Sequence, residues 1–186
     1  MVRAGVLPVD ERRRMIVEAT LPLLLESGEM VTTRQIADAA GIAEGTIFRV
    51  FADKHAVIDA VIDRALDPEP LELALGAIDP ALSFEQRLEA ATVIIQQRVV
   101  DVWRLVSSIG PRFHARGRRP MPDVTGALVE LLSAERDRLS MEPVPAARLL
   151  RALTLSVTHP MMVDEPMLPA DIVQLFLHGI SVRVPA

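Results

Sequence analysis

Cysteine and tyrosine are both absent from this sequence of 186 residues, which also has only one Trp and five Phe. Without cysteine the chain has no disulfide, no cysteine-ligated zinc and no thiol nucleophile. The scarcity of aromatic residues disfavours a β-sandwich or a β-barrel, whereas the abundance of Leu, Ala and Val favours helices. Because half of the residues are hydrophobic, the chain has enough apolar side chains for a substantial core. The composition therefore predicts an all-α protein.

Features typical of exported, membrane-spanning or catalytic proteins are also missing. The N-terminus has no basic segment followed by an apolar run, and no charge-free apolar stretch approaches the roughly 20 residues of a bilayer span, so we expect a cytoplasmic protein. The four His have no metal-binding spacing, and there is no Gly-rich phosphate loop or nucleophile elbow. The sequence predicts no enzyme, no metal and no cofactor, with metal sensing through His159, Asp164 and His178 as the alternative.

Positive charge is in short supply as well. The net charge of −5 argues against a protein that coats nucleic acid by bulk attraction. Residues 1–66 alone hold eight Lys and Arg against ten Asp and Glu, a net charge of −2. Any contact with DNA must therefore come from locally placed cations, and the candidates in this segment are Arg12, Arg13, Arg14, Arg34, Arg49 and Lys54.

The N-terminal part of the chain is expected to form four helices. Residues 1–9 have no periodic pattern and predict a flexible arm. Asp10 is a plausible cap for a first helix that Gly28 ends, and Pro22 inside it predicts a kink or an early break. Shorter helices are expected to follow, the second capped by Thr32 or Thr33, the third over residues 43–50 and the fourth from Asp53 to Leu66.

The sequence Asp-Pro-Glu-Pro at residues 67–70 interrupts the helical periodicity and predicts the boundary between domains. We therefore expect one domain over residues 10–66 and a second over residues 67–186. In the second domain, helices are expected at 71–78, 83–109, 122–140, 145–159 and 169–183. A basic loop with Arg112, Arg116, Arg118 and Arg119 is expected between two of them.

The second and third helices have the properties of a helix-turn-helix. Such a motif needs small residues where its helices cross, a turn residue that tolerates positive φ, and a second helix whose outer face has no core role. Ala37 and Gly41 meet the first two needs. The outer face of the third helix meets the last, with Glu44, Gly45, Thr46, Phe48 and Arg49. This spacing alone favours DNA binding only weakly, because many helical proteins contain it.

The detailed sequence from Thr32 to Val61, TTRQIADAAGIAEGTIFRVFADKHAVIDAV, closely resembles the tetracycline-repressor (TetR) family of one-component regulators. The matching elements are a Thr pair, Ile-Ala, Ala-Gly-Ile, Gly-Thr-Ile-Phe, and a Phe followed by a Lys after Asp. They lie in the first third of the chain. The resemblance implies an N-terminal three-helix helix-turn-helix DNA-binding domain and a C-terminal helical ligand-binding and dimerisation domain.

The resemblance also implies that residues 43–50 enter the major groove of DNA while Thr33, Arg34 and Lys54 hold phosphates. Arg49 is the only cation on the reading helix, so it is the candidate for a guanine, as a bidentate partner or as a phosphate clamp.

The other residues of the reading helix have narrower roles. Thr46 is suited to a base edge or a thymine methyl group, and Gly45 lets the backbone approach DNA closely. Glu44 either accepts from cytosine or acts as a favourable carboxylate at a helix start. The family often has Tyr where this chain has Phe48, so here the ring offers only apolar contact and no hydroxyl for a phosphate.

Beyond Asp67 the resemblance is one of architecture, and it implies a ligand pocket and a dimer interface near the C-terminus. The rare large side chains are the candidate ligand contacts, although each is also a common core residue: Trp103, Phe113, His159, Met161 and Met162. His159 precedes Pro160 at a helix end, so its ring either faces a cavity or caps the last carbonyls of that helix.

The C-terminal helix predicts an interface. Between Ile172 and Ile180 only Gln174 and His178 are polar, so the helix is apolar on all sides and must be covered on more than one. In so small a domain a partner subunit is the natural second cover, and a helix central to its own monomer is the alternative. The candidate dimerisation residues are Ile172, Leu175, Phe176, Gly179 and Ile180.

Together, the residues and the resemblance predict a ligand-responsive transcriptional regulator that binds double-stranded operator DNA as a homodimer. The resemblance implies repression, with release by an apolar or amphipathic small molecule that acts through the helix from Lys54 to Leu66. A helical carrier with no role on DNA is the competing class, but it leaves Arg34, Arg49 and Lys54 unexplained.

Overall fold

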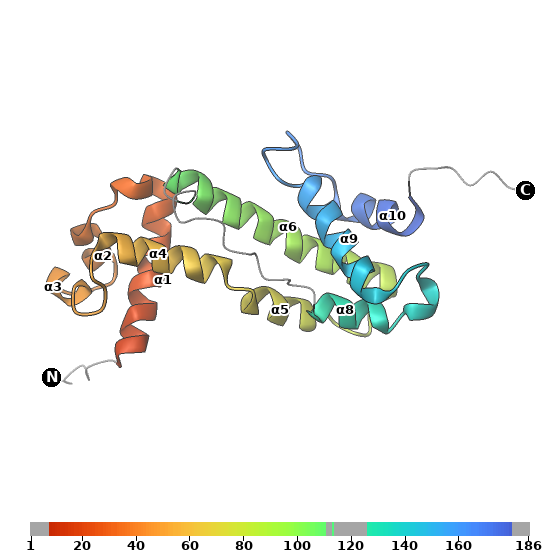
Figure 1. Ribbon diagram of the computed structural model, residues 1–186, viewed down its shortest axis with the longest axis horizontal. Helices are drawn as coiled ribbons and strands as arrows, with labels where there is room; N and C mark the ends of the chain where they lie inside the picture. Colours follow the sequence, from red (N-terminus) through yellow and green to blue (C-terminus); the bar gives the residue numbers. More distant parts are fainter. Residues whose placement is uncertain (1–7, 111–112, 114–125, 180–186) are drawn as a thin grey trace, which may run out of the picture. The chain divides into compact units, whose positions relative to one another are not determined.

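All regular structure in the computed structural model is helical, over the residues that it describes, which are 8–110, 113 and 126–179 (Figure 1). The all-α prediction is therefore confirmed. None of the described helices is long and apolar enough to cross a membrane. The chain forms two compact units, one from residues 1–67 with 104–120 and the other from residues 68–103 with 121–186.

The first unit is a small helical cluster in which α1 packs against α4 and α2, and α2 packs against α3 (Figure 1). Its elements are α1 (Val9–Ser27), a short 3₁₀ turn η1 (Gly28–Met30), α2 (Thr33–Ala39), α3 (Glu44–Ile47) and α4 (Lys54–Leu66). Each helix contributes apolar residues at helical spacing to one core, including the fully buried Ile16, Leu24, Ile36, Ile47 and Ile58. This core fixes the short helices α2 and α3.

One expectation for α1 is wrong. The helix begins at Val9 with Pro8 as its cap residue, so Asp10 lies inside the first turn, where its carboxylate faces the positive end of the helix dipole. Of the kink or early break expected at Pro22, the early break does not occur, because the helix continues to Ser27. The exposed side of the helix carries Pro22, while Thr20 and Leu24 are fully buried on the core side and hold the helix in place.

The second unit contains the remaining helices. They are α5 (Glu69–Gly76), α6 (Phe84–Ile109), α8 (Gly126–Ser133), a 3₁₀ turn η2 (Arg136–Arg138), α9 (Pro143–Ser156) and α10 (Pro169–His178). Here α8 packs against α5 and α9, and α10 packs against α9. The core includes the fully buried Leu88, Leu128, Leu132, Leu150 and Ile172. The interruption predicted over residues 67–70 is shorter in the structure, because α4 ends at Leu66 and α5 begins at Glu69.

Two helix boundaries in this unit differ from the predicted ones, because a Pro allows one helix to start earlier and a Gly ends another. Pro70 stands in the first turn of α5, where a backbone N–H has no partner inside the helix, so α5 begins at Glu69. At the other end of the chain α10 stops at His178, because Gly179 takes a positive φ of 72°. The basic loop predicted from its arginines lies outside the described residues.

The end of α6 belongs to the first unit. Leu105 and Ile109 are buried in the same core as Ile16 and Ile58, whereas the helix up to Trp103 belongs to the second unit. The sequence-based division placed all of residues 67–186 in the second domain and did not separate this last stretch. The contact is close at Gly28, whose φ is +56° and whose added Cβ would lie 2.3 Å from the backbone oxygen of Ser108.

We predict that Gly28→Ala lowers the free energy of unfolding by about 3 kcal/mol or more, because the variant combines a strained positive φ with a clash against backbone. Gly41→Ala is the matched control, since Gly41 has a φ of +65° but open space where a Cβ would lie. The control should lose only about 1–2 kcal/mol. Urea unfolding curves measure both values, and equal losses would show that the clash with Ser108 is relieved without cost.

Candidate nucleic-acid interface

The start of α2 is fixed by a capping box, and Thr32 is the cap. Its hydroxyl oxygen accepts from the backbone N–H of Gln35 at 3.2 Å. The side-chain oxygen of Gln35 accepts from the backbone N–H of Thr32 at 2.8 Å. Each side chain thus satisfies a backbone N–H that the helix leaves without a partner. The sequence left Thr32 and Thr33 as alternative caps, and the structure selects Thr32, so the Thr33 side chain is available for a different contact.

The turn between α2 and α3 has the expected geometry. Ala37 is 2% exposed and offers only a methyl group to the core. Gly41 has a φ of +65°, and the amide of Ile42 donates to the carbonyl of Ala37 at 3.0 Å, which closes the turn. A side chain at Gly41 would be strained by this backbone, which explains the glycine.

Helix α3 is shorter than the predicted range of 43–50. The α-helix covers Glu44–Ile47, and tighter turns carry the chain on to Val50, with the Arg49 amide donating to Thr46 and the Val50 amide to Ile47. Ile47 and Phe51 are buried, at 0% and 3% exposure. These two side chains anchor the segment to the core and turn its opposite side outward.

The outward side carries residues that the core does not use. Glu44, Gly45, Phe48 and Arg49 are exposed, and Thr46 is half-buried. Phe48 exposes 52% of its surface, which is unusual for an aromatic side chain. The Arg49 side chain makes no hydrogen bond or ion pair with any residue that the structure describes. A Cβ at Gly45 would meet nothing within 4 Å, so the backbone there is open to approach.

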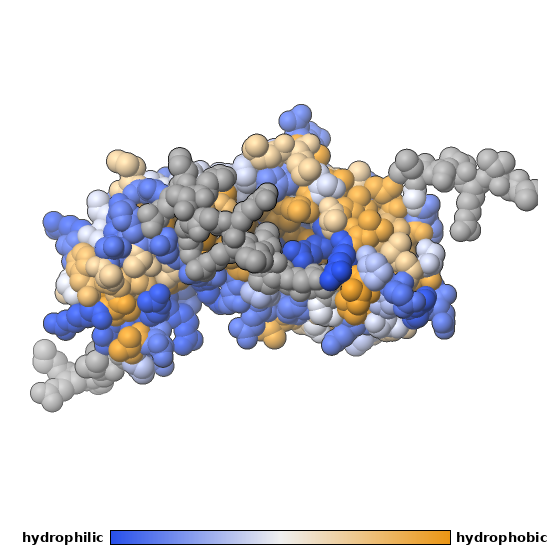
Figure 2. Space-filling view, viewed as in Figure 1, coloured by the Kyte–Doolittle hydropathy of each residue, from blue (hydrophilic) through white to orange (hydrophobic). Residues whose placement is uncertain are grey.

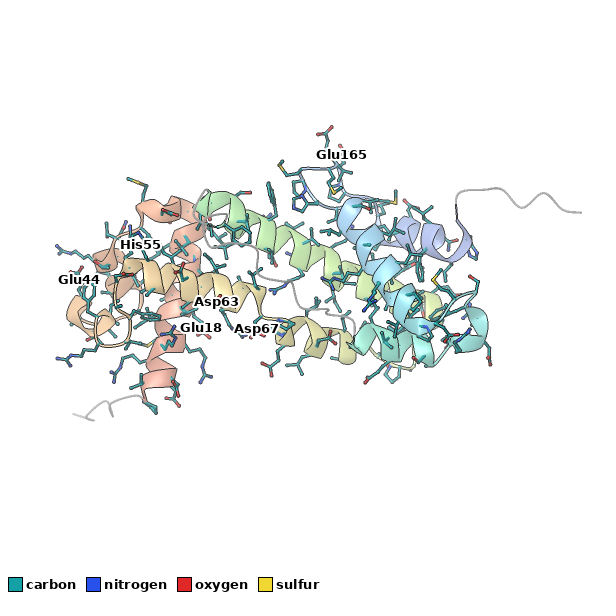
Figure 3. The ribbon with its side chains drawn as sticks, viewed as in Figure 1. Glu18, Glu44, His55, Asp63, Asp67 and Glu165 are labelled. Carbon is teal, nitrogen blue, oxygen red and sulfur yellow. The ribbon has the colours of Figure 1, made fainter. Side chains whose placement is uncertain are left out.

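Thr33 and Glu44 are brought together from the first positions of α2 and α3. The Thr33 hydroxyl donates a hydrogen bond to the Glu44 carboxylate, which lies at the α3 end of the first unit (Figure 3). Arg34, the next residue of α2, is exposed. Sequence reasoning placed Thr33 against a phosphate and did not foresee its link to Glu44, because nothing in the local pattern pairs residues on different helices.

Lys54 lies at the start of α4, just after the cap Asp53, whose carboxylate accepts from the Ala56 amide at 2.7 Å. The Lys54 ammonium group donates to the carbonyl of Glu29 at 2.8 Å, and the side chain is half-buried. An ammonium group has three protons, so this bond leaves two for other acceptors. Lys54 therefore ties α4 to η1 and retains donors for a phosphate.

Arg13 has a contact that the sequence did not predict. Its guanidinium carbon lies 4.3 Å from the centroid of the Phe51 ring, a cation–π arrangement that joins α1 to the end of the α3 segment. The two residues are far apart in sequence and share no local motif, so no sequence signal pairs them. Arg13, one of the candidate cations, thus helps to cover the residue that anchors α3.

Two of the five candidate ligand residues meet in the second unit. The rings of Trp103 and His159 pack edge to face with centroids 4.6 Å apart. The Nδ1 atom of His159 accepts from the Met161 amide at 3.2 Å, so this ring caps the turn after α9 as an acceptor. The sequence had suggested instead that the ring faces a cavity or caps the last carbonyls of the helix.

The other three candidate ligand residues are Met161, Met162 and Phe113. Met161 and Met162 are 73% and 64% exposed, in the loop that also carries Glu165 (Figure 3). Their role as ligand contacts stays a prediction. Phe113 packs partly against the core of the first unit. The described residues contain no group of three or more His, Asp or Glu that could hold a metal ion.

The candidate dimerisation residues differ in what they expose. Ile172 is fully buried in the core of its own subunit, so it has no surface for a partner, contrary to the prediction. Leu175 and Phe176 are half-buried, Gly179 is exposed at the end of α10, and Ile180 lies outside the described residues. The sequence did not identify Leu149 and Leu155 as candidate interface residues. They lie on the neighbouring helix α9 and are 46% and 44% exposed.

Apolar surface gathers over α9 and α10 in Figure 2, where these helices lie next to each other. On α9 the exposed positions Leu149, Ala152 and Leu155 recur at helical spacing and form one stripe. The signal for this stripe is present in the sequence, because α9 has apolar residues at these three positions in addition to those that enter the core. Reading it correctly requires knowing which side the core occupies.

Comparison with known proteins gives results for both parts of the chain. Residues 16–61 match the family model of "Bacterial regulatory proteins, tetR family". The chain is 28% identical over 95 residues to the nucleoid occlusion factor SlmA of Glaesserella parasuis, a match that covers 50% of this chain and 44% of that protein. It is 30% identical over 119 residues to the transcriptional repressor KstR2 of Mycobacterium tuberculosis, covering 56% and 57% of the two chains.

Both matches leave a large part of each relative uncovered, so the chain spans roughly half the length of the curated relatives that it matches. The fold extends further. The TetR-like regulator LfrR of Mycobacterium smegmatis, solved in complex with proflavine, superposes with a TM-score of 0.56 over 94% of this chain and 99% of its own. With 21% identity, this likeness establishes a shared fold.

Proposed function

We propose that this chain, whose residues 16–61 match the family model of the tetR bacterial regulatory proteins, is a dimeric repressor of that family that a small molecule releases from operator DNA. The observation that carries the proposal is the outward side of the α3 segment. Gly45, Phe48 and Arg49 are exposed there without a role in the core, on a segment that Ile47 and Phe51 anchor firmly. An exposed, anchored helix is what major-groove recognition needs.

The charge distribution supports recognition of a specific site over bulk attraction to DNA. Residues 1–66, which contain the α3 segment, have a net charge of −2, so the affinity of this segment for DNA must rest on a few placed cations. Residues 43–50, the α3 segment, are the reading segment of this proposal, and Arg49 is exposed on it. Arg34 is exposed on α2, and Lys54 keeps two donor protons beyond its bond to Glu29. In this proposal Arg49 reads a guanine, while Arg34 and Lys54 hold phosphates.

A homodimer follows from the exposed stripe on α9 and the half-buried Leu175 and Phe176 on α10. Together they offer an apolar surface on two adjacent helices, which suits a four-helix interface with a second copy of the chain. A two-fold dimer presents its reading segments to opposite half-sites, so the operator should be palindromic or nearly so. A footprint on a single half-site with one subunit bound would contradict this arrangement.

Release by a small molecule rests on the likeness to LfrR, which was solved with proflavine, and on the apolar character of the second unit. We propose an aromatic or amphipathic effector. Trp103 is the sole tryptophan of the chain and packs on His159, so its fluorescence reports on this part of the second unit. The effector acts by favouring one arrangement of the two reading segments over another.

The first prediction separates base contacts from phosphate contacts. Arg49→Ala should weaken binding to the operator by about 1–3 kcal/mol and relax preference at one base pair in each half-site. Lys54→Ala should weaken binding to every sequence by a similar factor and reduce the salt slope by roughly one unit for each phosphate that the variant no longer neutralises. Mobility-shift titrations of the operator and its single-base variants, at several salt concentrations, measure both effects.

The free energy of unfolding is the control for these two variants, because Lys54→Ala also removes the hydrogen bond to the Glu29 carbonyl. We expect that variant to lose roughly 1–2 kcal/mol of unfolding free energy, and Arg49→Ala to change by less than about 0.5 kcal/mol. The titrations are therefore made well below the thermal transition of each variant. A uniform loss of affinity in Arg49→Ala, with unchanged base preference, would reassign Arg49 to a phosphate.

The second prediction locates the dimer interface. Leu149→Glu should dissociate the dimer, because it brings a charge into an apolar contact without a partner. Leu73→Glu, on α5, is the matched control: it places the same charge on a leucine that is 68% exposed and lies outside the proposed interface. Light scattering at micromolar concentration should give one subunit's mass for Leu149→Glu and two for the control. Unchanged mass in Leu149→Glu places the interface elsewhere.

The third prediction concerns the effector. In a thermal-shift panel of aromatic, amphipathic and sugar-phosphate compounds, we expect the largest stabilisation from an aromatic or amphipathic member. A ligand at a hundred times its Kd stabilises the folded state by about 2.7 kcal/mol, which such an assay resolves easily. The same compound should quench or shift Trp103 fluorescence and raise the Kd for the operator. A sugar phosphate as the strongest stabiliser would contradict an apolar site.

A further inference from the structure

The hydrogen bond between Thr33 and Glu44 changes what each residue can do at the DNA surface. A threonine hydroxyl has a single proton, and here that proton is donated to the Glu44 carboxylate. The same proton is not available to a phosphate oxygen while this bond exists. A phosphate placed beside Thr33 would also meet the negative charge of Glu44. Thr33 is therefore poorly suited to the phosphate contact that the family resemblance implies.

Glu44 has acceptor capacity left over. An ionised carboxylate has two oxygens and about four lone-pair sites, and the Thr33 hydroxyl occupies one of them. The Glu44 carboxylate makes no other hydrogen bond or ion pair with the part of the chain that the structure describes. Its side chain is exposed at the start of the reading segment, on the same outward side as Gly45 and Arg49. The bond to Thr33 restricts the rotamers of a long side chain that otherwise moves freely.

A fixed acceptor in the major groove distinguishes bases by what they donate. Cytosine and adenine present amino groups there, whereas guanine N7 and O6 and thymine O4 are acceptors that a carboxylate repels. Adenine adds the acceptor N7 beside its amino group, so a carboxylate, which has no donor, suits cytosine best. Arg49, with donors only, has the opposite preference and favours guanine.

We infer that Glu44 reads the amino group of a cytosine and that Thr33 is its positioning residue rather than a phosphate contact. The inference rests on the proposed DNA-binding function and assigns base preference within it. The two charged residues of the reading segment then have different base preferences. Glu44 selects a cytosine, and Arg49 selects a guanine at a different base pair. Thr33 contributes to specificity without touching DNA.

The test is selection of bound duplexes from a random-sequence pool of double-stranded DNA, with the full-length wild type and a set of full-length variants. Glu44→Gln should lose preference for cytosine at one position of each half-site by about five- to thirty-fold, because the amide adds a donor. Thr33→Val removes the hydroxyl but keeps the β-branched shape, and it should reduce preference at the same position. Thr33→Ser keeps the hydroxyl and should retain the wild-type preference.

The double variant Thr33→Val with Glu44→Gln decides between the two roles of Thr33. A positioning residue has nothing left to position once Glu44 is replaced, so the double variant should show the base preference of Glu44→Gln alone. If Thr33 holds a phosphate instead, Thr33→Val weakens binding to every duplex by the same factor in both backgrounds. That result overturns the inference, as does unchanged cytosine preference in Glu44→Gln.

The outcomes also separate this inference from the proposed function. If the wild type selects a palindromic consensus and Glu44→Gln selects the same one, the inference fails and the DNA-binding function stands. If the wild type selects no consensus at all, both fail together. Arg49→Ala is the internal control, because it should change preference at a different base pair and leave the cytosine position intact. Circular dichroism and thermal midpoints establish that each variant is folded.

Discussion

The burial of Ile47 and Phe51 is the interaction on which the reading segment depends. A helix of four residues has too few internal hydrogen bonds to persist by itself, since isolated helices shorter than about 12–15 residues are marginal in water. The conformation of α3 must therefore come from tertiary contacts. Ile47 and Phe51 supply them from within the core of α1, α2 and α4, and the guanidinium of Arg13 covers the Phe51 ring. The outward face of the segment is the side that these buried residues leave exposed.

Polar side chains complete what the core begins. The capping box of Thr32 and Gln35 sets the start of α2, Asp53 caps α4, and Lys54 joins α4 to the carbonyl of Glu29. Each of these contacts satisfies a backbone group near a helix end, where unsatisfied groups are concentrated. The first unit thus combines a small apolar core with closely defined termini, and the residues that face outward from α3 have a rigid base.

Local chemistry made much of this arrangement predictable from the sequence. A cap, a glycine with positive φ and an apolar spacing each depend on near neighbours, which explains why Gly41, Asp53 and the burial of Ile47 and Phe51 were foreseen. The bond between Thr33 and Glu44 was not, because it joins residues that are close only in the folded chain. Periodicity identified α10 as an apolar helix but did not show which side its own subunit covers, so Ile172 was assigned to an interface when it lies in the core.

The tight contact at Gly28 has an evolutionary consequence. Any missense change of a single nucleotide in a glycine codon introduces a residue with a Cβ, and every such residue would approach the Ser108 carbonyl within 2.3 Å at a backbone φ that side chains disfavour. No replacement one mutational step away is therefore neutral at this position. A lineage that loses this glycine must first shift the end of α6, so the two segments are expected to change together or not at all.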